Sequence, residues 1–144
     1  MSDIKAETEK WWCDYLNRQT KAMGLQFYPS MTDADNDPPM GVVRVSEAEE
    51  VIPRSGVYKV DECQILVIST IDHSTSDQHK AAVQKVGFLI DAAPMQEDTT
   101  RILIRGRGPK TQTRGTDEDA DKCADIFTFP MGVAARSYEG NPDS

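Results

Sequence analysis

The apolar run at residues 65–68, Ile-Leu-Val-Ile, constrains the fold of this chain more than any other stretch of its sequence. It belongs to a longer strand-like segment, residues 57–70, whose first half alternates between apolar and polar side chains. Successive side chains on a β-strand point to opposite faces of the sheet. An uninterrupted apolar run therefore predicts a sheet that is covered on both faces. A strand end tucked under loops is the alternative interpretation.

Length and charge narrow the class of protein. A chain of 144 residues is expected to form one domain, which we place at residues 1–135 and follow with a flexible tail at 136–144. The formal net charge of -8 argues against general nucleic-acid binding and against binding to anionic membranes. The sequence shows neither a signal peptide at its start nor an apolar run of about 20 residues that could span a bilayer. Three widely spaced cysteines are expected to be reduced and half-buried.

Two helices are predicted. The first begins after Ser2 or Asp3, carries an apolar stripe that includes Trp11 and Trp12, and stops at Gly24. We interpret the tryptophan pair as core packing, with an exposed aromatic docking patch as the alternative. The second helix starts at a capping box over residues 75–78 and ends at Pro94.

Strands are predicted between and after these helices. The segments concerned are residues 25–28, 41–46, 57–70, 99–105 and 124–129. The order of helix, strands, helix and strands predicts an α+β domain with a mostly antiparallel sheet and both helices on one face. Because two helices can cover only one face, we expect a second copy or a partner to cover the other. Leu66 and Ile68 are then candidate interface residues.

Residues 106–122 are polar, lack a period and are predicted to form a long charged hairpin loop. Positive charges come first and negative charges follow. The candidate interface residues here are Arg105, Arg107, Lys110 and Arg114, and then Asp117, Glu118 and Asp119. Such segregated charges can meet their opposites on an adjacent copy, as in a head-to-tail ring. A solvated loop and pairing within the loop are the alternatives.

Candidate catalytic and metal sites are few. The paired Cys and His residues of a zinc site are missing, and His79 is expected to be a packed histidine whose ring is hydrogen-bonded near a strand end. A nucleophile pair of Cys63 and His73 would need a favourable turn after the strand. The aspartates at 33, 35 and 37 begin like an EF-hand, but Pro38 and Arg44 occupy positions that need Gly and Glu. We therefore predict no catalytic residue, metal or cofactor, and expect the protein not to be an enzyme.

Residues 41–94 resemble the tail-terminator and neck proteins of tailed bacteriophages. The likeness rests on Val43-Arg44-Val45, on residues 55–60 and 65–69, on the Asp72 to His79 segment, and on Phe88-Leu89-Ile90. It implies a small α+β virion subunit that forms a ring, commonly of six copies. That ring would cap the tail tube and bind the head connector.

The same resemblance implies assembly in the host cytoplasm and a genome that passes through the lumen without sequence-specific contacts. Three other functions stay open. The chain could be another neck or head-completion subunit. It could be a small hydrolase, in which His73, His79 and a carboxylate converge in a pocket. It could also be a monomeric binding module that uses the basic loop at residues 105–114.

Overall fold

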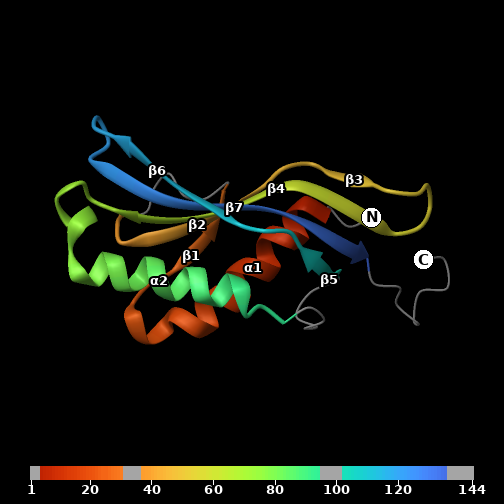
Figure 1. Cartoon of the computed structure of the whole chain (residues 1–144), viewed down its shortest axis with the longest axis horizontal. Helices are drawn as coiled ribbons and strands as arrows, with labels where there is room; N and C mark the ends of the chain where they lie inside the picture. The colour runs from red at the N-terminus through yellow and green to blue at the C-terminus, as the bar shows by residue number, and fades with distance from the viewer. Residues whose placement is uncertain (1–3, 31–36, 95–101, 136–144) are drawn as a thin grey trace.

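The computed structural model describes residues 4–30, 37–94 and 102–135, with the side chains of residues 102, 103 and 105 left undescribed. Figure 1 shows the elements in order. They are α1 (Ile4–Thr20), the 3₁₀ helix η1 (Lys21–Met23), β1 (Phe27–Pro29), β2 (Met40–Val45), β3 (Ala48–Glu50), β4 (Val57–Ser69), η3 (Asp72–Thr75), α2 (Asp77–Asp91), β5 (Ile102–Arg107), β6 (Thr111–Asp117) and β7 (Lys122–Ala135).

Two long antiparallel strands, β4 and β7, form the spine of the sheet. They have 13 and 14 residues, which corresponds to about 40 Å of extended chain. Along the edge of β4 that faces away from β7, β3 pairs with the first half of β4 and β2 with its second half. Along the edge of β7 that faces away from β4, β6 pairs with the first half of β7 and β5 with its second half. Among the strands described, the short β1 alone runs parallel to its neighbour. The predicted α+β class with a mostly antiparallel sheet is confirmed.

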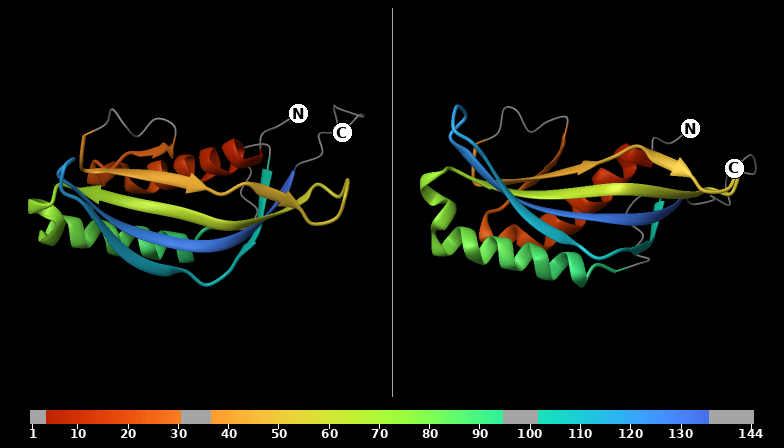
Figure 2. Two further views of the ribbon diagram at one scale, coloured as in Figure 1. Left: turned by 90° about the horizontal axis from the view of Figure 1, so that it is seen from above. Right: turned by 45° about the horizontal axis from the view of Figure 1, so that its top comes forward.

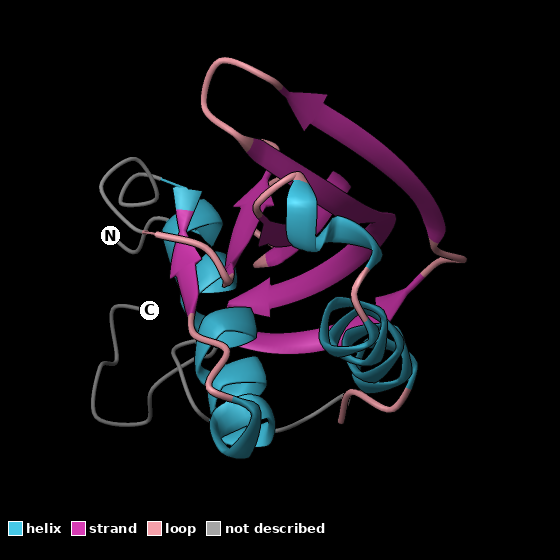
Figure 3. Ribbon diagram, turned by 90° about the vertical axis from the view of Figure 1, so that its left-hand side faces the viewer, coloured by secondary structure: helices cyan, strands magenta, loops and turns pink. Residues whose placement is uncertain are grey.

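Both helices lie against the same face of the sheet, whose strands curve over them when the molecule is seen along its long axis (Figure 3). The main core fills the space between, with Trp11, Trp12 and Leu16 of α1 fully buried against residues of β4 and β7. The Tyr15 hydroxyl of α1 donates a 2.7 Å hydrogen bond to the Leu89 carbonyl of α2. The interpretation of the tryptophan pair as core packing is therefore confirmed.

On the opposite face, the chain buries its own apolar run. Leu66 and Ile68 are only 4% and 7% exposed and form a second cluster with Met40 and Val42 of β2. Half-buried Tyr28, Ala124 and Ile126 pack against this cluster. The expectation that Leu66 and Ile68 need a second copy to cover them is wrong, because side chains of β1, β2 and β7 supply that cover. The alternative, a strand end tucked under loops, is right that the chain covers this run itself, but the cover described comes from neighbouring strands.

The predicted charged hairpin at residues 106–122 is present, but its arms are strands and not a loop. Residues 106–107 belong to β5, residues 111–117 form β6 paired to β7, and a tight turn occupies residues 118–121. Polar threonines of β6 favour an extended backbone, but its side chains are exposed on both faces and show no apolar alternation. A short strand, β3, likewise lies inside the predicted connection at 47–56. The final strand runs six residues beyond its predicted end at Phe129.

The residues predicted to end the first helix and to begin the second lie close to the observed helix ends. Gly24 ends η1 in the left-handed conformation, at φ 71°, as expected for a C-cap glycine. The second helix is capped by Ser76, whose hydroxyl accepts a 3.1 Å hydrogen bond from the His79 backbone N–H, and not by Thr75. The cap expected at residues 2–3, the aspartates at 33 and 35, and the predicted tail at 136–144 lie outside the described residues.

Gly41 of β2 is the register partner of Phe27 in β1. The ring of Phe27 lies over it, so that a Cβ atom added at Gly41 would stand 2.2 Å from two ring carbons. Phe27 is itself 1% exposed and has no room to withdraw. We expect Gly41→Ala to lower the free energy of unfolding by about 1–3 kcal/mol, the usual cost of overpacking a core. Equilibrium urea denaturation measures the change.

The matched control for this substitution is Gly106→Ala in β5. A Cβ atom built at Gly106 has no other atom within 4 Å, so the same chemical change meets open space. Its effect is expected to stay within about 0.5 kcal/mol. Equal losses at both positions would show that Phe27 does not restrict Gly41.

Candidate functional site

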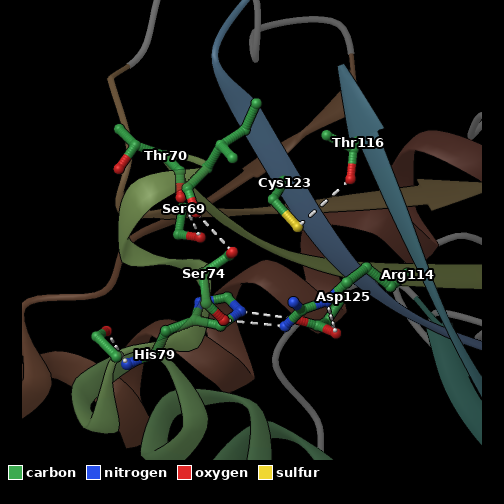
Figure 4. A network of polar contacts seen from close by, with 10 residues as sticks. Ser69, Thr70, Ser74, His79, Arg114, Thr116, Cys123 and Asp125 are labelled. Atoms are coloured by element: carbon green, nitrogen blue, oxygen red, sulfur yellow. Dashed lines mark hydrogen bonds and ion pairs between the residues drawn. The ribbon is translucent and has the colours of Figure 1, made fainter. Parts of the chain in front are cut away.

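A buried ionic network joins the sheet to the start of α2 (Figure 4). At its centre is Asp125 of β7, which is 5% exposed. Arg114 of β6 donates from Nε and from Nη2 to the two carboxylate oxygens of Asp125, at 3.1 and 3.0 Å. The His79 ring of α2 contacts the same carboxylate through Nε2, at 2.5 Å.

Backbone geometry brings these three side chains together. Arg114 and Asp125 are direct partners in the β6–β7 register, where side chains of facing residues lie on the same side of the sheet. The Ser76 cap fixes the first turn of α2 and holds His79 over β7. Arg114 also donates to the Ser74 carbonyl at 3.0 Å, which ties η3 into the network. One carboxylate thus links β6, β7 and the η3–α2 segment.

The network keeps Asp125 ionised. Burial alone would raise the pKa of its carboxyl group, but the hydrogen bonds and charges of Arg114 and His79 outweigh burial and hold that pKa below its usual value. Both carboxylate oxygens are already occupied by neighbours in the same chain. The arrangement therefore acts as an electrostatic clamp between elements that are far apart in sequence, and the expectation that His79 is a packed, hydrogen-bonded histidine is confirmed.

A cavity of about 530 Å³ lies beside this clamp. Its walls come from the end of η1, from Pro38 and Pro39, from the last residues of β4 and from the start of α2. His73 and His79 both line it, whereas Asp125 does not. A hydrolase site was expected to bring His73, His79 and a carboxylate together in one pocket. The cavity contains both histidines, but the carboxylate of Asp125 lies outside its lining.

No nucleophilic side chain, hydroxyl or thiol, among the described residues is hydrogen-bonded to the His79 ring. Cys63 is fully buried in the middle of β4, six residues or about 20 Å before the strand ends, while His73 is exposed beyond that end. Burial raises the pKa of the Cys63 thiol well above its usual value. The pair of Cys63 and His73 considered from the sequence is not formed.

All three cysteines are free and buried. Burial also raises the pKa of the Cys13 thiol, to about 12, so that this group stays protonated at neutral pH. The expected reduced state agrees with this arrangement, although the side chains are more deeply buried than predicted. Within residues 4–30, 37–94 and 102–135, no group of three His, Cys, Asp or Glu side chains could hold a metal ion. None of the helices described is long and apolar enough to cross a membrane.

Two predicted interface residues, Arg107 and Lys110, are bound at the C-terminal end of α2. Arg107 donates to the carbonyls of Ile90 and Asp91, each at 3.0 Å, and Lys110 lies 2.6 Å from the Asp91 carboxylate. The last carbonyls of a helix lack intrahelical partners and attract positive charge. These two side chains therefore stabilise their own chain, as Arg114 does. The side chain of Arg105 lies outside the described set.

The acidic candidates lie elsewhere. Asp117, Glu118 and Asp119 are exposed at the tip of the β6–β7 hairpin, where the Asp117 carboxylate accepts a 3.2 Å hydrogen bond from the Ala120 backbone. No salt bridge joins this tip to the basic residues of the same segment in the part of the chain that the structure describes. Of the described residues predicted to form an interface, these three and Arg114 are exposed, and Arg114 is already paired with Asp125.

Two buried carboxylates escaped the sequence analysis. Asp125 falls in phase with Phe127 and Phe129, and an acid in phase with core aromatics is a signal that a buried partner must exist. Glu9 lies on the apolar stripe of α1 and is 4% exposed. Its carboxylate accepts hydrogen bonds from the Val45 backbone and from the Ser30 hydroxyl, each at 3.1 Å.

Comparisons with known proteins assign no family to this chain. No protein-family model matches the chain, and no curated protein matches it. One solved structure, of a protein designated only by a catalogue number, is similar with a TM-score of 0.45 and 17% sequence identity, over 94% of each chain. These values carry no inference about function.

Proposed function

We propose that this chain is a structural subunit of a tailed bacteriophage, a tail terminator that forms a ring at the top of the tail tube and joins it to the head connector. The observation that carries the proposal is the elongated sheet with two different exposed ends (Figure 2). One end is the acidic tip of the β6–β7 hairpin, and the other is the turn between β3 and β4, where large apolar side chains are exposed.

Unlike ends are what a ring subunit needs. Contacts between two different surfaces of identical chains are heterologous, and they generate a closed ring when the rotation between neighbours closes. Identical patches that meet across a two-fold axis would give only a dimer. A rigid sheet about 40 Å long, held together by β4 and β7, keeps its two ends at a fixed separation and orientation.

Charge and layout support the same assignment. The order of elements agrees with the resemblance at residues 41–94, which implies a small α+β ring subunit. A net charge of -8 suits a lumen through which a genome passes, because an acidic wall repels phosphates and limits non-specific binding. Another neck subunit would share these features and differ in the tail component that it contacts.

Electron microscopy and native mass spectrometry of the purified chain test this function. We expect closed rings, of about six copies, either in solution at high concentration or on the ends of added tail tubes. Binding to tube ends would distinguish a terminator from a head-side neck subunit. A chain that stays monomeric at every concentration and does not bind tubes would contradict the proposal.

A further inference from the structure

The turn between β3 and β4 presents an ordered apolar projection, which we call the knob and define as Val51, Ile52 and Pro53. Val51 and Ile52 are 57% and 63% exposed and adjacent in the chain, so they form a small apolar patch. The backbone of the turn is nevertheless fixed. Val51 N–H donates to the Val57 carbonyl at 2.9 Å, and Ser55 N–H donates to the Ile52 carbonyl at 3.0 Å.

Fixed apolar side chains at the tip of a hairpin suit binding rather than folding. They contribute nothing to the core of their own chain, yet the turn that carries them is held by backbone hydrogen bonds and by the Glu50 carboxylate, which accepts from the Gly56 N–H at 2.9 Å. A preordered side chain loses little entropy when it is buried by a partner.

The cavity of about 530 Å³ lies at the opposite end of the same strand, and we call it the hole. The knob precedes the first residue of β4, whereas the hole is lined by Ile68 and Ser69, the last two residues of the strand, and by Thr70 after them. Figure 1 shows the β3–β4 turn and the start of α2 at opposite ends of the long axis. Knob and hole therefore lie about 40 Å apart and cannot meet within one chain.

The lining of the hole matches an apolar occupant. Met23, Leu25, Pro39 and Ala82 supply apolar surface from three separate segments of the chain, and the volume lies in the range of pockets that enclose small organic groups. Two apolar side chains on one turn are a suitable occupant for such a cavity.

Charges of both signs surround the two surfaces: exposed Glu49 and Glu50 precede the knob, and exposed Lys80 lies between lining residues His79 and Ala81 of the hole. Arg54 stands beside the knob, is exposed, and forms no salt bridge within the described residues. At the rim of the hole, Asp72 precedes lining residue His73, and Asp77 lies between lining residues Ser76 and Gln78. Both aspartates are exposed. Pairing of Arg54 with Asp72 or Asp77 would favour one orientation of approach, whereas the Glu50 carboxylate is already held by the Gly56 N–H.

We infer that the knob of one copy enters the hole of the next copy, and that this heterologous contact links the subunits of the ring. The inference rests on the proposed function for its ring, and it adds the identity of the two surfaces that meet. An apolar projection that fits a cavity elsewhere on the same molecule joins copies head to tail, which gives rings when the geometry closes and filaments when it does not.

Disulfide trapping between two variants, each with one added cysteine, tests the contact directly. One variant carries Ile52→Cys in the knob, and the other carries Ala81→Cys in the lining of the hole, where the side chain is exposed. The three native cysteines are buried and serve as a silent background. We expect an oxidised mixture to give a cross-linked dimer, each variant alone to give none, and the double variant to give a ladder that ends at the ring size.

Matched controls use positions with similar exposure. Ile52→Cys mixed with Lys85→Cys, one helical turn beyond Ala81 and outside the hole, should give no dimer. Without cysteines, Ile52→Asp should weaken self-association at least tenfold, because a carboxylate would enter an apolar cavity. Phe88→Asp, at an apolar residue that is also 63% exposed, should leave self-association unchanged. Circular dichroism confirms that each variant is folded.

The outcomes separate the two proposals. Rings in the microscope without a disulfide in the knob-and-hole mixture would overturn the inference and leave the proposed function standing. Cross-linking of Ile52→Cys to itself would show a two-fold contact and would also overturn the inference. A specific disulfide that leads only to open filaments would support the contact and refute the closed ring. If the chain does not associate at all, with or without tail tubes, both the proposed function and the inference are refuted.

Discussion

Asp125→Ala is expected to lower the free energy of unfolding by about 3 kcal/mol, because it leaves His79 and Arg114 without their shared partner. The effect should lie at the lower end of the range for broken buried ion pairs. The Arg114 side chain is 43% exposed and can regain water, whereas the His79 side chain, at 4%, cannot. Urea denaturation followed by circular dichroism at neutral pH measures the loss.

The pH dependence gives this prediction a second readout. The folded chain holds the Asp125 pKa below its unfolded value, so the carboxylate stabilises the fold fully above the unfolded pKa, about 3.9. That contribution is lost as the pH falls through the lower folded pKa. The difference in stability between wild type and Asp125→Ala should therefore shrink as the pH falls below about 4.

A matched control separates the clamp from the general loss of a negative charge. Glu118→Ala removes an exposed carboxylate from the nearby hairpin tip and should change stability by no more than about 0.5 kcal/mol. A difference between wild type and Asp125→Ala that stays constant down to strongly acidic pH would show that Asp125 is not ionised in the fold.

The clamp also shows where sequence reasoning stops. The periodicity of residues 77–91 and the apolar run at 65–68 predicted α2 and the core of β4, because both patterns are local. Strand β6 has no apolar pattern to reveal it. It is positioned by cross-strand pairs such as Arg114 with Asp125, and the sequence does not state such pairings.

The interface prediction failed in part for the same reason. Counting helices suggested that one face of the sheet needed a partner, but Leu66 is covered by Met40 and Val42 of β2 and by half-buried neighbours. Arg107 was visible as a charge, while its partners at the end of α2 lie 16 and 17 residues earlier in the chain. Contacts between secondary-structure elements decide which polar side chains are paired within the chain. The acidic side chains at residues 117–119 stay exposed and form no salt bridge among the described residues.

Trp12→Ala should have the largest effect of any single change considered, lowering the free energy of unfolding by about 3–5 kcal/mol. The Trp12 side chain is fully buried and joins α1 to β7. Its ring packs edge-on against Phe129 at a centroid distance of 5.4 Å, and its Nε1–H lies 3.4 Å from the Met131 sulfur. A domain of this kind has only about 5–15 kcal/mol of stability, so much of it would be lost.

Two comparisons complete the test of Trp12. Trp12→Phe keeps an aromatic ring in the core and gives up only the indole N–H and part of the volume, so its cost should be about half as large. Phe88→Ala truncates an aromatic ring that is 63% exposed and should cost no more than about 0.5 kcal/mol. Urea denaturation followed by far-ultraviolet circular dichroism avoids reliance on the fluorescence that Trp12 itself supplies. A loss for Trp12→Ala as small as that for Phe88→Ala would return the tryptophan pair to the role of a surface docking patch.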